Sequence, residues 1–428
     1  MSEAASVSFA DALKVWTRIG LLSFGGPTAQ IGLMHRILVD EQKWLDEQHY
    51  LSALSFCMLL PGPEAMQLAT YAGWRLHGLK GGLAAGLLFV LPGAAVVLAL
   101  SMVYAAFGNL PVIEAVFFGI KAAVLVIVVE ALLRISRRAL KERQHWVMAG
   151  LSFLGIFFLG LPFPLIVLLA ALYGFARSSA GKAGAVPLPL VSIGDTARTI
   201  AVWLVLWIAP LAAIAAIFGR DHVLTQLSWF FSKLAVVTFG GAYAVLAYMG
   251  QDVVEHSHWL APGQMIDGLG LAETTPGPLI LVTEFVGYLA AYRHGAGPAI
   301  GMGLLGAAVA LWATFAPCFL WIFAGAPYIA WMNGQPRLKG ALTAITAAVV
   351  GVILNLAIWF GLHVFFGTVT LTEAWPLRLW LPTLNTLDWR VVLLAALSAV
   401  LLLRRHWGIP SVLGVAAGLA LALRFAGV

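Results

Sequence analysis

Long, nearly uninterrupted runs of apolar residues recur along most of the chain, for example at 147–176, 199–219 and 341–367. A membrane-crossing helix needs about 20 consecutive, mostly apolar residues. Only helices and closed barrels satisfy their backbone groups inside a bilayer. The pattern therefore predicts an all-α polytopic membrane protein with about 10–14 transmembrane segments.

The composition supports this prediction. Of the 428 residues, 61% are hydrophobic and only 10% are charged, whereas about a quarter are charged in soluble domains. Many of the 44 glycines and 20 prolines lie inside apolar runs, where neighbouring helices satisfy the freed backbone groups, so we expect discontinuous helices. Cys57 and Cys318 lack metal-like spacing and are interpreted as packing residues.

We interpret the net charge of +6 as a sign of which loops face the cytoplasm. Basic residues beside apolar runs mark cytoplasmic loops and contact anionic lipid headgroups, so they do not indicate nucleic-acid binding. We expect three basic regions, at 134–143, 177–198 and 404–405, to face the cytoplasm. The first twenty residues contain charged positions and no uninterrupted apolar core, so no cleavable signal peptide is expected.

Two parts of the chain resemble each other at an offset of 215 residues. Residues 16–26 (WTRIGLLSFGG) and 231–241 (FSKLAVVTFGG) match by chemical class, and Pro61-Gly62-Pro63 matches Pro276-Gly277-Pro278 without a gap. We predict an N-terminal transmembrane repeat at 1–176, a cytoplasmic linker at 177–198 and a C-terminal transmembrane repeat at 199–428. The residues alone leave open whether the repeats are inverted or parallel.

The repeated motifs are helix breaks. The Gly25-Gly26 and Gly240-Gly241 pairs leave backbone N–H groups unshielded, and each Pro-Gly-Pro motif interrupts a helix and starts a new one. Helix amino termini near the membrane midplane hold anionic groups in transporters. The break residues Gly25, Gly26, Gly62, Gly240, Gly241 and Gly277 are therefore candidate substrate-binding positions. Close helix packing and simple kinks are the alternative explanations.

Several side chains join this candidate site. Arg18 and Lys233 occupy the same repeat position, about 10 Å before each glycine pair along a helix. They fit an anion path or a structural ion pair, with snorkelling to the headgroups as the alternative. Hydroxyl and amide groups suit oxyanions without adding charge, and the candidates are Ser23, Gln67, Thr238, Thr274 and Thr275.

Carboxylates are expected to act in coupling or gating. Glu64, Gln67, Tyr71 and Arg75 follow at spacings of three and four, so they share one helix face that should line a cavity. Glu64 also fits a capping role at a helix amino terminus. Because carboxylates repel anions, Glu64, Glu273 and Glu284 are expected to bind a proton, to orient a cation, or to pair with Arg75 or Arg293. Arg75 is itself a candidate for coupling or gating.

Motifs for nucleotide binding, zinc-dependent catalysis and thiol redox chemistry are absent from the sequence. The chain has no phosphate-binding Gly-x-x-x-x-Gly-Lys-Ser/Thr loop, no His-Glu-x-x-His and no redox cysteine pair. His256 and His258 alone are a weak metal signal. We expect no metal, no cofactor and no enzymatic activity.

The break motifs and their neighbours resemble those of the chromate ion transporter family, in its long two-domain bacterial members. The resemblance covers about 9–130 and 226–325, and its specific elements are Phe24-Gly25-Gly26-Pro27, Pro61-Gly62-Pro63-Glu64 with 67–74, and 272–280. It implies chromate efflux by a multi-pass protein of the bacterial inner membrane, with two homologous halves of inverted topology. Met66 and Glu284 depart from the polar amides usual in similar sequences.

We therefore expect a secondary transporter that exports chromate, a tetrahedral oxyanion, and confers chromate resistance. Transport of sulfate or another oxyanion, and an anion channel of the same architecture, are the alternatives; a membrane scaffold would not need the repeated breaks. A potential of about 100 mV supplies roughly 4.6 kcal/mol to a leaving dianion, so no ATP is required, and the carboxylates leave proton coupling open. Expected partners are the oxyanion and membrane lipid; a homodimer is left open.

Overall fold

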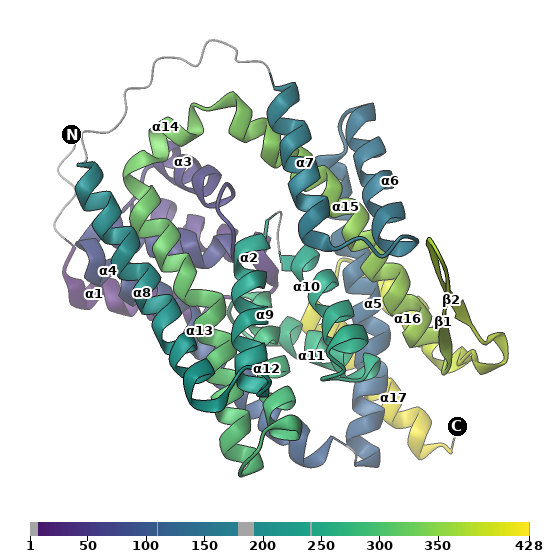
Figure 1. Ribbon diagram of the computed structural model, residues 1–428. Coiled ribbons are helices and arrows are strands. Elements are labelled where there is room, and N and C mark those ends of the chain that lie inside the picture. Colours follow the sequence, from purple (N-terminus) through teal and green to yellow (C-terminus); the bar gives the residue numbers. More distant parts are fainter. Residues whose placement is uncertain (1–6, 109, 179–191, 240–241, 428) are drawn as a thin grey trace. The chain divides into compact units, whose positions relative to one another are not determined.

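The computed structural model describes residues 7–108, 110–178, 192–239 and 242–427. The described chain is almost entirely helical, with one two-stranded antiparallel hairpin (Figure 1). It forms two compact units. Unit 1 comprises Met1–Met102, Ser179–Ala242 and Thr275–Lys339, and unit 2 comprises Val103–Ser178, Tyr243–Thr274 and Gly340–Val428. Gly240, Gly241 and most of the linker predicted at 177–198 lie outside the described residues.

Unit 1 contains the predicted break at Gly25-Gly26 and both Pro-Gly-Pro motifs. Short 3₁₀ and π-helical turns are labelled η. The elements of unit 1 are α1 (Phe9–Leu22), α2 (Gly26–His35), η1 (Arg36–Glu41), α3 (Glu47–Cys57), most of α4 (Glu64–Phe107), α8 (Ile193–Phe218), α9 (Val223–Val237), η3 (Leu279–Leu281), α12 (Val282–His294), α13 (Ala299–Gly325), η4 (Ala326–Tyr328) and α14 (Ile329–Asn333).

Unit 2 contains the remaining elements, including the hairpin. They are α5 (Pro111–Ala139), α6 (Arg143–Phe157), α7 (Phe163–Arg177), α10 (Ala242–Gln251), η2 (Asp252–His256), α11 (Pro262–Thr274), α15 (Pro336–Phe365), β1 (Val369–Ala374), β2 (Leu377–Pro382), η5 (Leu384–Thr386), α16 (Trp389–Ala399), η6 (Val400–Arg404) and α17 (Ile409–Phe425); α10 and α15 begin with residues of unit 1.

Five described helical segments are long and apolar enough to cross a membrane: Glu64–Phe107, Pro111–Ala139, Ile193–Phe218, Ala299–Asn333 and Pro336–Phe365. Three shorter apolar helices, α7, α9 and α17, accompany them. The predicted class, an all-α polytopic membrane protein, is confirmed. The number of spans stays a prediction.

In unit 1, two helical hairpins pack with almost no side-chain separation. Helix α4 folds back at His77 and Gly78, where the backbone leaves the helical conformation. A Cβ on Gly73 would lie 2.3 Å from the carbonyl oxygen of Gly81 on the returning arm. Helices α12 and α13 meet in the same way, because a Cβ on Gly287 would lie 2.5 Å from the carbonyl oxygen of Gly306. Glycine thus brings both pairs into backbone contact.

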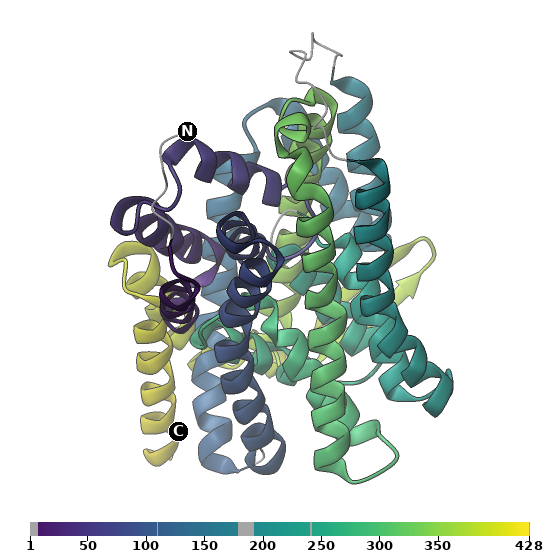
Figure 2. The ribbon, with the colours of Figure 1, turned by 90° about the vertical axis from the view of Figure 1, so that its left-hand side faces the viewer.

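Helix α13 also runs beside α8, as Figures 1 and 2 both show. The indole N–H of Trp312 on α13 donates a hydrogen bond of 3.2 Å to the carbonyl of Trp207 on α8. The outer side of α8 is apolar and exposed, with Val205 63% and Ile217 74% accessible. Such a surface suits contact with hydrocarbon.

The same local geometry occurs at two positions 215 residues apart. Each of the π-helical turns η1 and η2 follows a ten-residue helix. Lys43 and His258 then take positive φ values of 55° and 51°. The amide of Trp44 donates to Leu38, and the amide of Trp259 donates to Val253. The polar loops around Trp44 and Trp259 therefore share one backbone path.

In unit 2, α5 packs against α11, α16 and α17. A Cβ on Gly119 of α5 would lie 2.2 Å from the carbonyl oxygen of Ala416 on α17, so this contact is also close. Strands β1 and β2 pair in antiparallel register from Val369 opposite Pro382 to Ala374 opposite Leu377. The hairpin is attached to the α6 end because Arg378 N–H donates to the carbonyl of Phe158. The sequence patterns considered above did not predict this hairpin.

Candidate functional site in unit 1

The predicted helix breaks of unit 1 are present at the expected residues. Helix α1 ends at Leu22 and α2 begins at Gly26, while α4 begins directly after Pro63. Helix α11 ends at Thr274, and the chain restarts as η3 at Leu279, after the second Pro-Gly-Pro. The breaks form because proline lacks an N–H and disfavours helix before it.

Each Pro-Gly-Pro break is tied to the end of a helix from the other half of the sequence. The N–H of Gly62 donates to the carbonyl of Thr238, just after α9, at 2.9 Å. The N–H of Gly277 donates to the carbonyl of Ser23, just after α1, at 2.8 Å. Ser23 and Thr238 are 215 residues apart, as are Gly62 and Gly277. The two bonds are therefore exchanged between equivalent positions.

Glycine is required at both bonds. Gly62 has a φ of +117° and Gly277 a φ of +89°, which L-residues with a side chain rarely adopt. A Cβ on Gly62 would lie 2.9 Å from the Sγ of Cys318, and one on Gly277 would lie 2.9 Å from Leu281 Cδ1. The limited space and the backbone conformation both disfavour a larger residue.

A buried amide strengthens the second break. Gln30 on α2 is 1% exposed, and its Nε2 donates to the carbonyls of Gly277 at 2.6 Å and Ser23 at 3.3 Å. At the first break, Gln67 Nε2 donates to the carbonyl of Pro61 at 2.7 Å. Sequence reasoning identified Gln67 but missed Gln30, because Val245 occupies the equivalent position and the repeat comparison gives no polar signal there.

The amino terminus of α2 supplies donors beside the second break. Gly25 and Gly26 both have positive φ, are half-buried, and form the start of this helix without a side-chain cap. The first N–H groups of a helix have no partner within it, and Thr28 adds an exposed hydroxyl. This terminus can donate to an oxyanion. By contrast, the N–H groups of Gly62 and Gly277 are occupied in this conformation.

Further buried polar groups lie in unit 1. The Oε1 of Gln67 and the Oε2 of Glu284 are buried without a hydrogen-bond partner among the described residues. Thr314 Oγ1 lies 3.5 Å from Thr283 Oγ1. Cys318, one turn after Thr314, approaches Gly62 as described above. Buried unpaired polar atoms are costly, so these groups are candidates for contact with a permeating ion, a proton or water.

We name eight residues of these breaks the break cluster: Ser23, Gly25, Gly26, Gln30, Gly62, Gln67, Thr238 and Gly277. Seven of them are sequence-predicted site residues, and hydrogen bonds join five of the eight directly across the breaks. Thr275 is also buried in unit 1, next to Pro276.

The predicted basic residues and Glu64 lie on helices α1, α9 and α4 of unit 1. Arg18 is half-exposed on α1, and its Nη1 donates to Glu41 Oε2 at 2.9 Å. Lys233 is half-buried on α9, and Arg75 is exposed on the first arm of α4. Glu64 is half-buried at the first position of α4, where a carboxylate is favoured by the helix dipole. The predicted roles of these residues stay predictions.

The remaining predicted residues belong to unit 2. Glu273 is 5% exposed on α11, and its Oε1 accepts a hydrogen bond of 2.7 Å from the hydroxyl of Tyr243. Thr274 donates to the carbonyl of Leu271. Another buried carboxylate on α11, Asp267, accepts from Tyr104 at 2.8 Å and lies 3.4 Å from Lys121 Nζ. Sequence reasoning did not single out this last group, because its members lie far apart in the chain.

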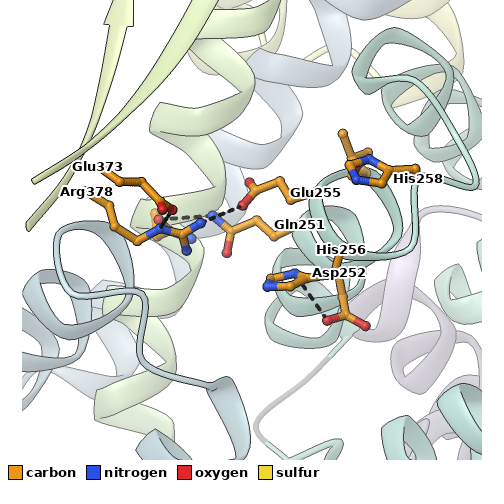
Figure 3. A network of polar contacts seen from close by, with 9 residues as sticks. Gln251, Asp252, Glu255, His256, His258, Glu373 and Arg378 are labelled. Atoms are coloured by element: carbon orange, nitrogen blue, oxygen red, sulfur yellow. Dashed lines mark hydrogen bonds and ion pairs between the residues drawn. The ribbon is translucent and has the colours of Figure 1, made fainter. Parts of the chain in front are cut away.

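A polar network surrounds Glu255 in the loop between α10 and α11 (Figure 3). Arg378 of the hairpin bonds Glu373 at 2.9 Å and lies 3.9 Å from Glu255. Burial raises the pKa of Glu255 to about 7, partly opposed by the charge of Arg378. His256 pairs with Asp252, and His258 contacts the carbonyl of Val254. Within the described residues, no group of three His, Cys, Asp or Glu side chains could hold a metal ion.

Comparison with known proteins extends these findings. The family described as Chromate transporter matches residues 10–175 and 225–423. The chain is 31% identical over 345 residues to a chromate transport protein of Cupriavidus metallidurans, covering 80% of each chain. It is 31% identical over 409 residues to a chromate transport protein of Pseudomonas aeruginosa, covering 91% of each. No solved structure matches it.

The family match includes every residue of the break cluster and spans both halves of the chain. With its apolar helices and interrupted segments, this multi-pass membrane protein belongs to the chromate transporter family.

Proposed function

We propose that this protein is a secondary transporter that exports chromate from the cytoplasm across a bacterial inner membrane. The membership of the family and the names of the two relatives support chromate as the substrate. Chromate is a tetrahedral dianion, and the donors at the start of α2 suit the oxygens of such an ion. Sulfate has the same shape and charge, so competition between the two ions has to be measured.

The exchanged hydrogen bonds between the breaks are the observation that carries this proposal. Each break in one half is held by a helix end of the other half, so a rearrangement of either half changes both breaks. Each such bond contributes about 1 kcal/mol net. Breaking both hydrogen bonds would cost roughly 2 kcal/mol. This is less than the roughly 4.6 kcal/mol that a dianion gains in crossing a potential of about 100 mV. The membrane potential can therefore drive the change.

We further propose that the two halves are inverted repeats that alternate access to the break cluster. The shared loop geometry around Trp44 and Trp259 supports the repetition, and the inverted topology is the expectation drawn from the family resemblance. The carboxylates Glu64, Glu273 and Glu284 are then positions at which proton coupling could be added. Coupling is separable from substrate binding, because the break cluster itself contains no carboxylate.

The test uses the purified full chain in lipid vesicles with labelled chromate. A potential that is positive inside should drive saturable chromate uptake, and competition by unlabelled sulfate then measures the preference between the two ions. Uptake of labelled sulfate without chromate uptake would show that the substrate is sulfate and that chromate is not transported. Non-saturating flux with single-channel currents would identify a channel. In chromate-sensitive cells, expression should lower internal chromate; a rise would reverse the proposed direction.

A further inference from the structure

Helices α6 and α7 of unit 2 enclose a crevice that the transport proposal does not use. Its volume is about 820 Å3, and one face of each helix lines it. The walls are mostly apolar, including Val147, Leu151 and Leu154 of α6 and Leu169 of α7. The polar atoms come mainly from one end, where Arg143, Gln144 and Tyr173 lie.

The crevice is accessible along its length. Leu151 is 64% exposed, Val147 53%, Leu154 49% and Leu169 52%. The opposite face of α6 is buried within unit 2, because a Cβ on Gly351 of α15 would lie 2.1 Å from the carbonyl oxygen of Ala149. In a multi-pass membrane protein, an exposed apolar face of this kind lies against hydrocarbon or another protein.

The depth of the crevice matches one leaflet of a bilayer. From Arg143 to Leu154, α6 rises eleven residues, or about 16 Å at 1.5 Å per residue. Half of the hydrocarbon core is about 15 Å. A ligand lying in the crevice would therefore place one end at the basic mouth and the other near the bilayer midplane. This is the geometry of a phospholipid.

The mouth of the crevice is basic. Six basic and two acidic residues lie at the end of α5, the start of α6 and the end of α7. The basic residues are Arg134, Arg137, Arg138, Lys141, Arg143 and Arg177, and the acidic ones are Glu130 and Glu142. Arg134 pairs with Glu130. An anionic headgroup is therefore favoured here over a zwitterionic one.

Two guanidinium groups are positioned at the mouth. Gln144 Oε1 accepts from Arg177 Nε at 3.1 Å and from the Tyr173 hydroxyl at 3.4 Å, which holds Arg177 beside α6. The amide of Gln144 donates to Glu142 at 2.5 Å. Arg143 is exposed and forms no ion pair among the described residues. Guanidinium groups bind phosphate oxygens in a bidentate manner.

We propose that this crevice binds one anionic phospholipid of the cytoplasmic leaflet. Its phosphate would contact Arg143 and Arg177, and an acyl chain would run along Val147, Leu151 and Leu154. The cytoplasmic side follows from the concentration of basic residues at the mouth. The shape, depth and charge of the crevice favour a lipid over a second copy of the chain.

The test measures lipids retained by the purified full chain in native mass spectrometry. We expect the wild type to retain phosphatidylglycerol in preference to phosphatidylcholine. R143Q with R177Q should lower phosphatidylglycerol retention at least about fivefold, or ~1 kcal/mol, and leave phosphatidylcholine unchanged. Leu151→Trp, which fills an exposed part of the crevice, should lower retention of both. The control R404Q with R405Q changes exposed arginines that do not line the crevice, and it should behave as the wild type.

Three outcomes would overturn the proposal: equal retention by the R143Q/R177Q variant and the wild type, no preference between the lipids, or an equal loss in the control. A lipid-free dimer crosslinked through the cysteine of a Leu151→Cys variant would assign the crevice to a second copy. R143Q alone is the second variant, because Arg143 is exposed and unpaired and its loss should not impair folding. The readout does not depend on chromate transport, so the two proposals fail separately.

Discussion

At Gly62 and Gly277, the absence of a side chain decides the path of the backbone. Each glycine has a positive φ and donates its N–H to a helix end from the other half of the sequence. Their roles follow from contacts as well as from conformation, because Cys318 and Leu281 occupy the space where a Cβ would stand.

We predict that Gly62→Ala and Gly277→Ala each lower stability by roughly 2–3 kcal/mol, from left-handed strain of about 1–2 and overpacking of about 1 or more. Thermal unfolding in detergent measures this loss. Gly32→Ala on α2 is the matched control, since no atom lies within 4 Å of its Cβ position, and it should be neutral or slightly stabilising. Equal midpoints for all three variants would contradict the prediction.

A second residue-scale prediction concerns the donors at the start of α2. Gly26 has a φ of +77°, with no atom within 4 Å of its Cβ position, so an alanine there strains the turn and crowds an approaching oxyanion without a steric clash inside the protein. Gly26→Ala should raise the chromate Kd at least about tenfold, near 1.4 kcal/mol.

Gly32→Ala again serves as the control for Gly26→Ala, because it lies on the same helix and away from its start. Binding is measured on purified variants of matched thermal stability. An unchanged Kd for Gly26→Ala would remove the start of α2 from the site. Gly241→Ala is the equivalent substitution in the second half, at a residue outside those described.

At the scale of elements, the sequence patterns predicted the helix breaks but missed the hairpin. Proline and glycine restrict or free the backbone at their own positions, so the helix breaks at 61–63 and 276–278 could be located from the sequence. Gln30 could not be identified, since the partner with which it forms the shorter hydrogen bond, Gly277, lies 247 residues away. Strand β2 alternates strictly between exposed and half-buried positions, but the last three residues of β1 are all exposed, and the attachment of the hairpin depends on distant residues such as Phe158.

The hairpin network also gives a pH-dependent prediction. Burial raises the pKa of Glu255 to about 7, above the value of about 4.3 in an unfolded chain. The folded state therefore binds this proton more tightly, and the free energy of unfolding falls as the pH rises from about 4.3 to about 7. The contribution is on the order of 3 kcal/mol once the pH exceeds 7.

Glu255→Gln should therefore stabilise the protein at pH 8 and have little effect at pH 5. Arg378 keeps Glu373 as a partner in this variant, so its charge is not left alone. Thermal unfolding of both proteins between pH 5 and pH 8 tests the prediction. Parallel pH profiles, or a larger loss in the variant at pH 8, would show that Glu255 does not titrate in this way.

At the scale of the whole molecule, the chain passes repeatedly between its two compact units. Both Pro-Gly-Pro breaks belong to unit 1, although one comes from each half of the sequence. The predicted boundary at 177–198 divides the sequence by its repeats, whereas the compact units combine segments of both halves. Sequence order alone could not reveal this combination, because it depends on contacts such as that between Gly62 and Thr238.

The energy source is a prediction at the same scale. Collapsing the potential with valinomycin and potassium, while a pH gradient is maintained, should abolish chromate accumulation in vesicles, because a dianion gains about 4.6 kcal/mol from 100 mV. If accumulation persists, the pH gradient is the driving force, and the carboxylates Glu64, Glu273 and Glu284 are the candidates for binding the coupled proton.

The central claim is that the oxyanion binds at the break cluster of unit 1. Cryo-electron-microscopy maps of the full chain with and without saturating chromate test it most directly. We predict a difference peak within about 3 Å of donors at the start of α2 or of the Gln67 side chain, since this is the distance of a hydrogen bond. A peak confined to unit 2, or the absence of a peak near either break in a chromate-saturated protein, would contradict the account.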